Sequence, residues 1–192
     1  PITKWNLARF AECLIPLINT DENKAIEIAT EVIDNFQNIY EEKWLNMMRD
    51  KLGIFGEDQN DKKMINDLLD WMKKNKVDYT NTFCKLMNVN NTDNKIYQDS
   101  TFVNWLKIWQ KRTLINNNSK DKSLKLMKNT NPIIIPRNHK VEEALSAANE
   151  ENFEKLKDLI KILKNPYDDK NKEKSFLSSS TSKIPYKTYC GT

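Results

Sequence analysis

Residues 60–75 read NDKKMINDLLDWMKKN, and this stretch decides the fold class. Its apolar side chains recur at intervals of three and four residues, at Met64, Ile65, Leu68, Trp71 and Met72. That spacing places them on one face of an α-helix, with Asp and Lys side chains on the other. Asn60 or Asp61 can cap its amino-terminal end. The stretch predicts an amphipathic helix packed on a hydrophobic core.

The same period recurs along most of the chain. It predicts helices in residues 3–19, 25–52, 80–87, 102–109, 124–127, 138–148 and 153–163. Pro16 predicts a kink or a break near Cys13, and the weak helix formers Asn35 and Asn38 predict a bend. Gly53 suits a left-handed helix end, and Thr80 is the expected cap of the helix that follows it.

Composition supports an all-α class. The 192 residues include only three Gly and six Pro, which favours long regular elements over turn-rich β architecture. The bulky aromatic side chains at helical spacing are interpreted as core and not as a ligand platform. Irregular packing of several helices is therefore the expected architecture.

One segment must depart from the helix. Ile133-Ile134-Ile135 lies between Pro132 and Pro136, so residues 132–136 are predicted to run extended and to be buried on more than one side. Asn138 is the expected cap of the next helix.

The pattern divides the chain into three parts. Residues 1–164 are predicted to form a helical domain, and residues 165–183 form a polar linker without apolar periodicity. Residues 184–192 bring back apolar and aromatic side chains and read as a tail that docks onto a surface. The chain starts at Pro1 with no readable targeting signal, so it is interpreted as a piece of a longer protein.

Charge and cysteine usage narrow the function classes. The net charge of +4 comes from 31 basic and 27 acidic residues that interleave, and most of the basic ones are Lys. This argues against nucleic-acid binding, which favours clustered Arg, and no apolar run is long enough to predict membrane association. Cys13, Cys84 and Cys190 are widely spaced, which argues against a disulfide framework or a zinc site and favours a reducing, cytoplasmic setting. Cys13 and Cys84 are expected to be buried.

Three residues are candidates for chemistry. His139 is the only histidine, and a structural role at a helix start is preferred over a catalytic one. Arg137 can bind a phosphate or pair with a carboxylate, and the ion pair is the preferred interpretation. Cys190 lies next to Gly191 near the chain end, where a thiol is either an accessible redox group or an incidental part of a docked tail. No glycine-rich phosphate loop is present, and no catalytic or metal-binding set is predicted in this chain.

Four motifs resemble one known family. They are Trp5-Asn6-Leu7-Ala8-Arg9-Phe10-Ala11-Glu12, Asp78-Tyr79-Thr80-Asn81-Thr82-Phe83, Asn131-Pro132-Ile133-Ile134-Ile135-Pro136-Arg137-Asn138-His139, and the ending Tyr186-Lys187-Thr188-Tyr189-Cys190-Gly191-Thr192. Together they resemble the C-terminal region of the selenoprotein O (YdiU) family of kinase-like protein adenylyltransferases. Cys84 departs from that pattern, because the family usually has Arg after this Phe.

The resemblance implies that the catalytic groups lie in another part of the intact protein. The intact protein would transfer AMP from ATP to hydroxyl groups of substrate proteins and would need Mg. ATP and metal would bind in a kinase-like domain upstream of Trp5, which would also be the partner of this chain. Cys190 would match the family's near-terminal redox cysteine, with a disulfide partner upstream. The alternative hypothesis is a helical protein–protein interaction module with no catalytic role.

Overall fold

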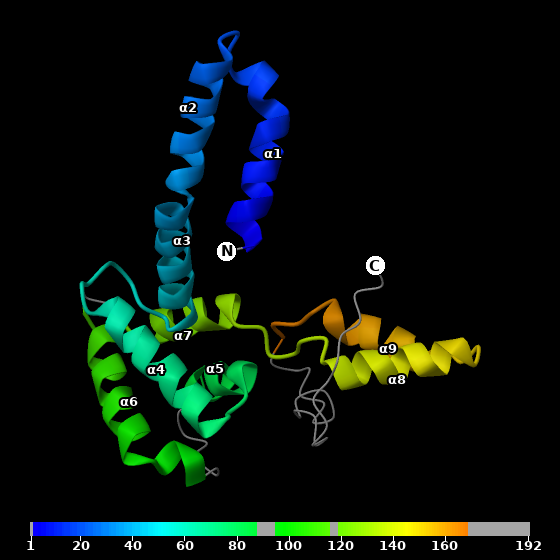
Figure 1. Cartoon of the computed structure of the whole chain (residues 1–192). Coiled ribbons are helices and arrows are strands. Elements are labelled where there is room, and N and C mark those ends of the chain that lie inside the picture. Colours follow the sequence, from blue (N-terminus) through cyan, green and yellow to red (C-terminus); the bar gives the residue numbers. More distant parts are fainter. Residues whose placement is uncertain (1, 88–94, 116–118, 169–192) are drawn as a thin grey trace. The chain divides into compact units, whose positions relative to one another are not determined.

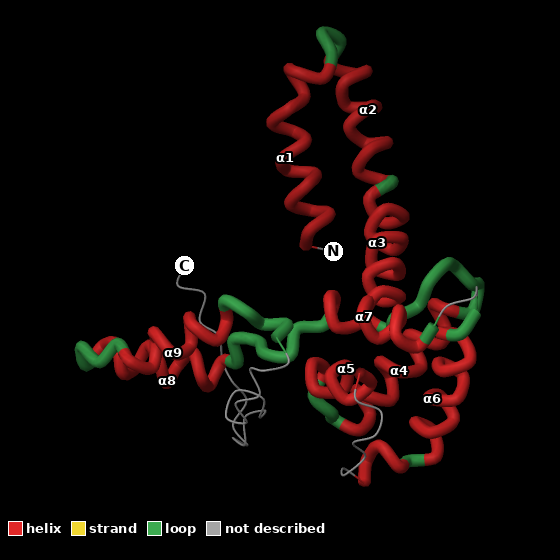
Figure 2. The backbone as a smooth tube through the Cα atoms, turned by 180° about the vertical axis from the view of Figure 1, so that it is seen from behind, coloured by secondary structure: helices red, strands yellow, loops and turns green. Residues whose placement is uncertain are grey.

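The computed structural model of the chain describes residues 2–87, 95–115 and 119–168. Within these ranges the regular structure is helical and no strand occurs, as Figure 2 shows, so the all-α prediction is confirmed. The chain divides into two compact units, Pro1–Met48 and Arg49–Thr192. The predicted tail, 184–192, and most of the predicted linker, 165–183, lie outside the described residues.

The first unit is built on a helical hairpin. Helices α1 (Ile2–Ile18) and α2 (Glu22–Asp34) lie side by side in opposite directions (Figure 1). Asp21 starts α2, since its carboxylate accepts hydrogen bonds from the backbone N–H groups of Asn23 and Lys24. The unit also contains most of α3 (Phe36–Lys51), and the turn at Asn35 that separates α2 from α3 confirms the predicted bend.

Helix α1 differs from the prediction in two respects. It does not break near Cys13, since the helix continues through Pro16 to Ile18. Pro16 has no N–H to donate to the Glu12 carbonyl, so the helix continues without that hydrogen bond. The Cys13 side chain is exposed, so it does not fill a core, and its Sγ donates to the carbonyl of Arg9 at 3.5 Å.

The second unit contains the remaining elements. They are α4 (Asp61–Asn75), α5 (Tyr79–Met87), a 3-10 turn η1 (Lys95–Gln98), α6 (Ser100–Thr113), α7 (Lys120–Thr130), α8 (Asn138–Asn149) and α9 (Glu154–Leu163). Helices α4 and α6 pack side by side, and α8 and α9 form a second hairpin (Figure 1). No helix in the described ranges combines the length and the apolarity that crossing a bilayer requires.

Aromatic side chains fill the core between α4 and α6. The ring centroids of Trp71 and Phe102 lie 4.5 Å apart, and those of Trp105 and Trp109 lie 5.9 Å apart. All four side chains are buried. Their indole N–H groups are satisfied: Trp105 donates to the Met64 carbonyl and Trp109 to the Leu52 carbonyl, both at 2.8 Å. These aromatics therefore form core, as predicted.

Gly53 allows α3 and α7 to approach each other. Its φ of +66° is the left-handed conformation predicted for this helix end. A Cβ atom at this position would lie 2.7 Å from the Ser123 carbonyl oxygen and 2.9 Å from a side-chain atom of Met127. Both the backbone conformation and the close approach therefore require glycine.

A buried ion cluster joins three elements of the second unit. Asp61, at the start of α4, is 1% exposed and accepts hydrogen bonds from Arg49 Nε at 2.8 Å and Arg112 Nε at 2.7 Å. Arg112 also donates to the carbonyls of Phe55 and Gly56. Burial alone would raise the pKa of Asp61, but the hydrogen bonds from Arg112 and Arg49 outweigh it and hold the pKa below its usual value.

We expect Asp61→Asn to destabilise the fold by about 3–5 kcal/mol, because Arg112 would lose its buried counter-charge and Arg49 would keep only the exposed Glu57. Urea unfolding of the 192-residue chain, followed by circular dichroism, measures this loss. Asp67→Asn is the matched control, since the exposed Asp67–Lys63 pair on the same helix contributes only about 0.5 kcal/mol or less. Equal midpoints for the two variants would contradict this account.

Candidate functional site

The structure brings two of the sequence motifs together in the second unit. Arg137, which precedes α8, donates from Nη1 to Asp78 Oδ2 at 2.7 Å and from Nη2 to Asp78 Oδ1 at 3.1 Å. The same Nη2 donates to Asn81 Oδ1 at 3.2 Å. We call Asp78, Asn81, Arg137, Lys51 and Asn131 the motif junction. Its two-pronged ion pair fixes both position and orientation, because a guanidinium and a carboxylate match in plane.

Asp78 has a second task at the start of α5. Its Oδ1 accepts a hydrogen bond from the backbone N–H of Asn81 at 2.8 Å, so Asp78 satisfies the first turn of the helix. The prediction that Thr80 caps this helix is therefore wrong, since α5 already begins at Tyr79. Burial would raise the pKa of Asp78, but the hydrogen bonds from Arg137 and from the Asn81 backbone lower it overall.

Asn131 forms the other connection. It is buried, and its Nδ2 donates to the carbonyls of Lys51 at 2.8 Å and Met127 at 2.9 Å. Its Oδ1 accepts from Lys51 Nζ at 3.0 Å. Asn131 thus ties the end of α7 to the end of α3, and every polar atom of its amide takes part.

The Lys51 ammonium lies above two aromatic rings of α5. Its Nζ is 5.5 Å from the centroid of Tyr79 and 4.9 Å from that of Phe83. Burial lowers the pKa of Lys51, and the nearby Cys84 opposes this effect. Cys84 is half-buried, not fully buried as expected, and its Sγ donates to the Pro132 carbonyl at 3.8 Å. The Lys51 cation therefore lies close to Cys84.

Residues 132–136 contain no helix, as predicted, but the expected burial holds only for the middle of the segment. Ile134 is buried, whereas Ile133 and Ile135 are partly exposed. The backbone N–H groups of Ile133 and Ile134 both donate to the Pro166 carbonyl, at 2.7 and 3.2 Å. These two hydrogen bonds hold the segment beside the residues that follow α9.

The start of α8 differs in detail from the prediction. Arg137, with an extended backbone, occupies the cap position, and Asn138 is the first, exposed residue of the helix. No side chain caps this end. His139 is partly exposed in the first turn, where its charge helps to lower the pKa of Glu143 after the larger effect of the Lys140 hydrogen bond.

Other predicted residues do not join this site. Trp5, Asn6 and Arg9 lie on α1 in the first unit and are exposed or partly exposed. The Arg9 guanidinium lies 5.7 Å from the Trp5 ring centroid and pairs with Glu12. Cys190 lies outside the described residues.

The motif junction is built to hold segments together. In the described ranges no buried side-chain nitrogen or oxygen is without a hydrogen-bond partner. No group of three His, Cys, Asp or Glu side chains there is placed to hold a metal ion. Sequence reasoning missed Lys51 and Asp78 as members, because their partners lie 80 and 59 residues away along the chain.

We expect a coupling energy of about 1–3 kcal/mol between Asp78 and Arg137 in a double-mutant cycle of Asp78→Asn and Arg137→Gln, because the partly buried, two-pronged pair is lost in either single variant. Chemical unfolding of the four proteins at pH 7 measures it. Because the pKa of Asp78 is lower in the folded state than its ordinary 3.8, this stabilisation exists above that value. It disappears as the pH falls through the folded-state pKa.

The control is the pair of Lys140 and Glu143 on the surface of α8, whose Nζ and Oε2 atoms lie 3.1 Å apart. We expect these two residues to couple by less than about 1 kcal/mol. Additive effects of the Asp78 and Arg137 variants, or a coupling that grows in acid, would refute the role assigned to the junction.

Comparison with known proteins identifies the family. The sequence profile described as "Protein adenylyltransferase SelO" matches residues 1–164. A "Protein nucleotidyltransferase YdiU" of Pelagibacter ubique is 53% identical over 192 residues, covering 100% of this chain and 40% of the relative. Proteins with the same description from Nitrosococcus oceani and Clostridium perfringens are each 44% identical, over 100% and 98% of this chain and 39% of their own length. The chain thus spans about two fifths of these relatives, and it belongs to the SelO (YdiU) family of protein adenylyltransferases.

Proposed function

We propose that this chain is the non-catalytic, helical C-terminal part of a protein adenylyltransferase. The observation that carries the proposal is the family match over residues 1–164 by a chain that spans 40% of a 53% identical relative. The intact protein would transfer AMP from ATP to Ser, Thr or Tyr hydroxyl groups of other proteins. This chain would support that activity through its contacts.

The motif junction supports this role, because its groups pair with one another and hold segments of the chain together. We expect ATP and Mg²⁺ to bind in a kinase-like part of the intact protein. That part would be the first partner of this chain, and substrate proteins the second.

A helical interaction module without catalytic purpose is the competing function. The exposed apolar side chains of α1 and α2, among them Trp5, Phe10 and Leu17, favour a protein-binding surface in either case. The two functions differ in what the longer polypeptide does, so activity of that polypeptide separates them.

We expect the protein expressed from its natural start to add AMP to itself or to a substrate protein when it is incubated with Mg²⁺ and ATP. Intact-mass spectrometry detects the added mass. The 192-residue chain is the parallel control and is expected to add nothing. Transfer of phosphate, or no transfer by the long form, would favour a kinase or a binding module and overturn the proposal.

Cys190 is the proposed redox element of the intact protein. We expect it to form a reversible disulfide with a cysteine outside this chain, and Cys190→Ser to remove that bond and any dependence of AMP transfer on thiol reductants. Non-reducing peptide mapping of the intact protein measures the bond, with Cys13→Ser as the matched control. A Cys190 thiol that stays reduced under oxidising conditions would exclude this role.

A further inference from the structure

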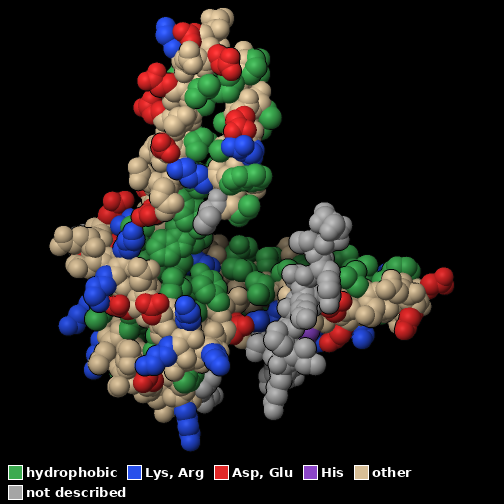
Figure 3. Space-filling view, viewed as in Figure 1, with side chains coloured by type: hydrophobic (Ala, Val, Ile, Leu, Met, Phe, Trp, Pro, Cys, Tyr) green, Lys and Arg blue, Asp and Glu red, His purple; other side chains and the backbone are tan. Residues whose placement is uncertain are grey.

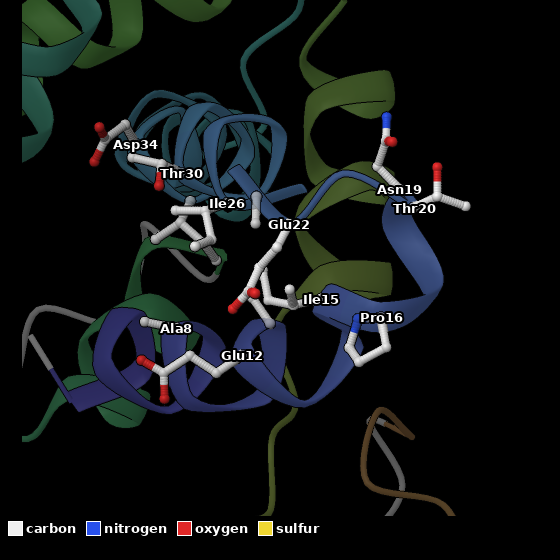
Figure 4. A pocket seen from close by; sticks show the side chains of 13 residues that line it. Ala8, Glu12, Ile15, Pro16, Asn19, Thr20, Glu22, Ile26, Thr30 and Asp34 are labelled. Carbon is white, nitrogen blue, oxygen red and sulfur yellow. The ribbon is translucent and has the colours of Figure 1, made fainter. Parts of the chain in front are cut away.

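A groove of about 920 Å³ runs between α1 and α2 within the first unit. Apolar side chains form much of its lining, including Ala8 and Ile15 from α1 and Ile26 from α2. Figure 4 shows Ile26 and Glu22 reaching from α2 toward α1. The two helices thus form a trough with an apolar floor.

The polar lining of the groove is acidic. Glu12, Glu22 and Asp34 all contribute to it. Glu12 pairs with Arg9 and Asp34 with Lys4, whereas Glu22 has no ion-pair partner within the described ranges. The neighbourhood strengthens this bias, because every Asp, Glu, Lys or Arg from residue 10 to residue 42 is acidic except Lys24. The hairpin is locally anionic in a chain whose net charge is +4.

Apolar side chains are also exposed along the same hairpin. Leu17 is 82% exposed, Val32 63% and Phe10 62%. Figure 3 shows hydrophobic and acidic side chains intermixed on these helices. The hairpin thus presents several large apolar side chains beside the groove's acidic ones.

We propose that the α1–α2 groove receives a basic amphipathic helix from the part of the polypeptide that lies outside this chain. Two observations choose this occupant. The relatives extend for about three fifths of their length beyond the match, so a tethered partner of sufficient size is available. The acidic walls and apolar floor complement a helix that carries Lys or Arg on one side and aliphatic residues on the other. The inference rests on the proposed function, because it assumes that longer polypeptide.

Helix geometry supports the occupant. Side chains three and four residues apart form ridges, and a trough between two packed helices accepts such a ridge. Glu22 lies in the first turn of α2, next to the groove, and would gain a cationic partner on binding. The surrounding apolar side chains would leave water at the same time.

The first test is zero-length carbodiimide crosslinking of the intact protein, followed by peptide mass spectrometry. We expect Glu22 and Glu12 to link to Lys residues outside this chain. Glu27 and Glu31 lie on α2 but do not line the groove, and they serve as internal controls that should form such links much less. Links from Glu22 only to Lys residues of this chain or of a second copy would overturn the proposal.

The second test uses matched variants and hydrogen exchange of α1 and α2 in the intact protein. Ile26→Asp and Glu22→Lys alter the groove and are expected to increase exchange about tenfold. Val32→Asp and Glu27→Lys alter exposed positions of the same helix outside the groove and should leave it unchanged. Circular dichroism of each variant in the 192-residue chain verifies that the hairpin still folds.

Equal exchange of α1 and α2 in the intact protein and in this chain would also overturn the proposal. The two proposals fail separately. Crosslinks from Glu22 without AMP transfer would refute the adenylyltransferase function and keep the groove's occupant. AMP transfer without such crosslinks from Glu22 would refute the groove's occupant and keep the adenylyltransferase function.

Discussion

The carboxylate of Asp61 lies almost wholly out of water between the guanidinium groups of Arg49 and Arg112. These three residues come from the end of α3, the start of α4 and the end of α6. Burying charges costs several kcal/mol per ion unless each finds its counter-charge and its hydrogen bonds. Here each does, since Arg112 also reaches the carbonyls of Phe55 and Gly56. The loop before α4 and the aromatic core between α4 and α6 depend on that geometry.

The motif junction repeats this principle at a second place in the same unit. Arg137 and Asp78 fix the approach of α8 to α5, and Asn131 fixes the end of α7 against the end of α3. The motif residues Asp78, Arg137 and Asn131 therefore make contacts between segments that lie far apart along the chain. Such contacts tolerate little change, because a two-pronged pair demands both charge and shape.

The two units differ in how far they bury their apolar side chains. The second unit buries Trp71, Phe102, Trp105 and Trp109 in a core of its own. The first unit leaves Trp5, Phe10, Leu17 and Val32 largely exposed, and Ala25 is its only residue on α1 or α2 that is classed as buried among those described. A hairpin of two helices cannot enclose a core by itself, since each helix buries only the face that packs on the other. The exposed apolar surface of α1 and α2 is therefore the expected place for a partner.

Local patterns were enough to predict most of the helices, the interruption at Asn35, the left-handed end at Gly53 and the helix-free stretch between Pro132 and Pro136. These features depend on neighbours within a few residues, whose spacing is visible in the sequence. The folded chain was needed to see that Arg137 pairs with Asp78, that Asp78 and not Thr80 caps α5, and that Cys13 is exposed. Each of these depends on which helix faces which, and a residue 59 positions away leaves no periodic signal. Charge and burial at a site are properties of packing, and packing is settled only when the whole chain has folded.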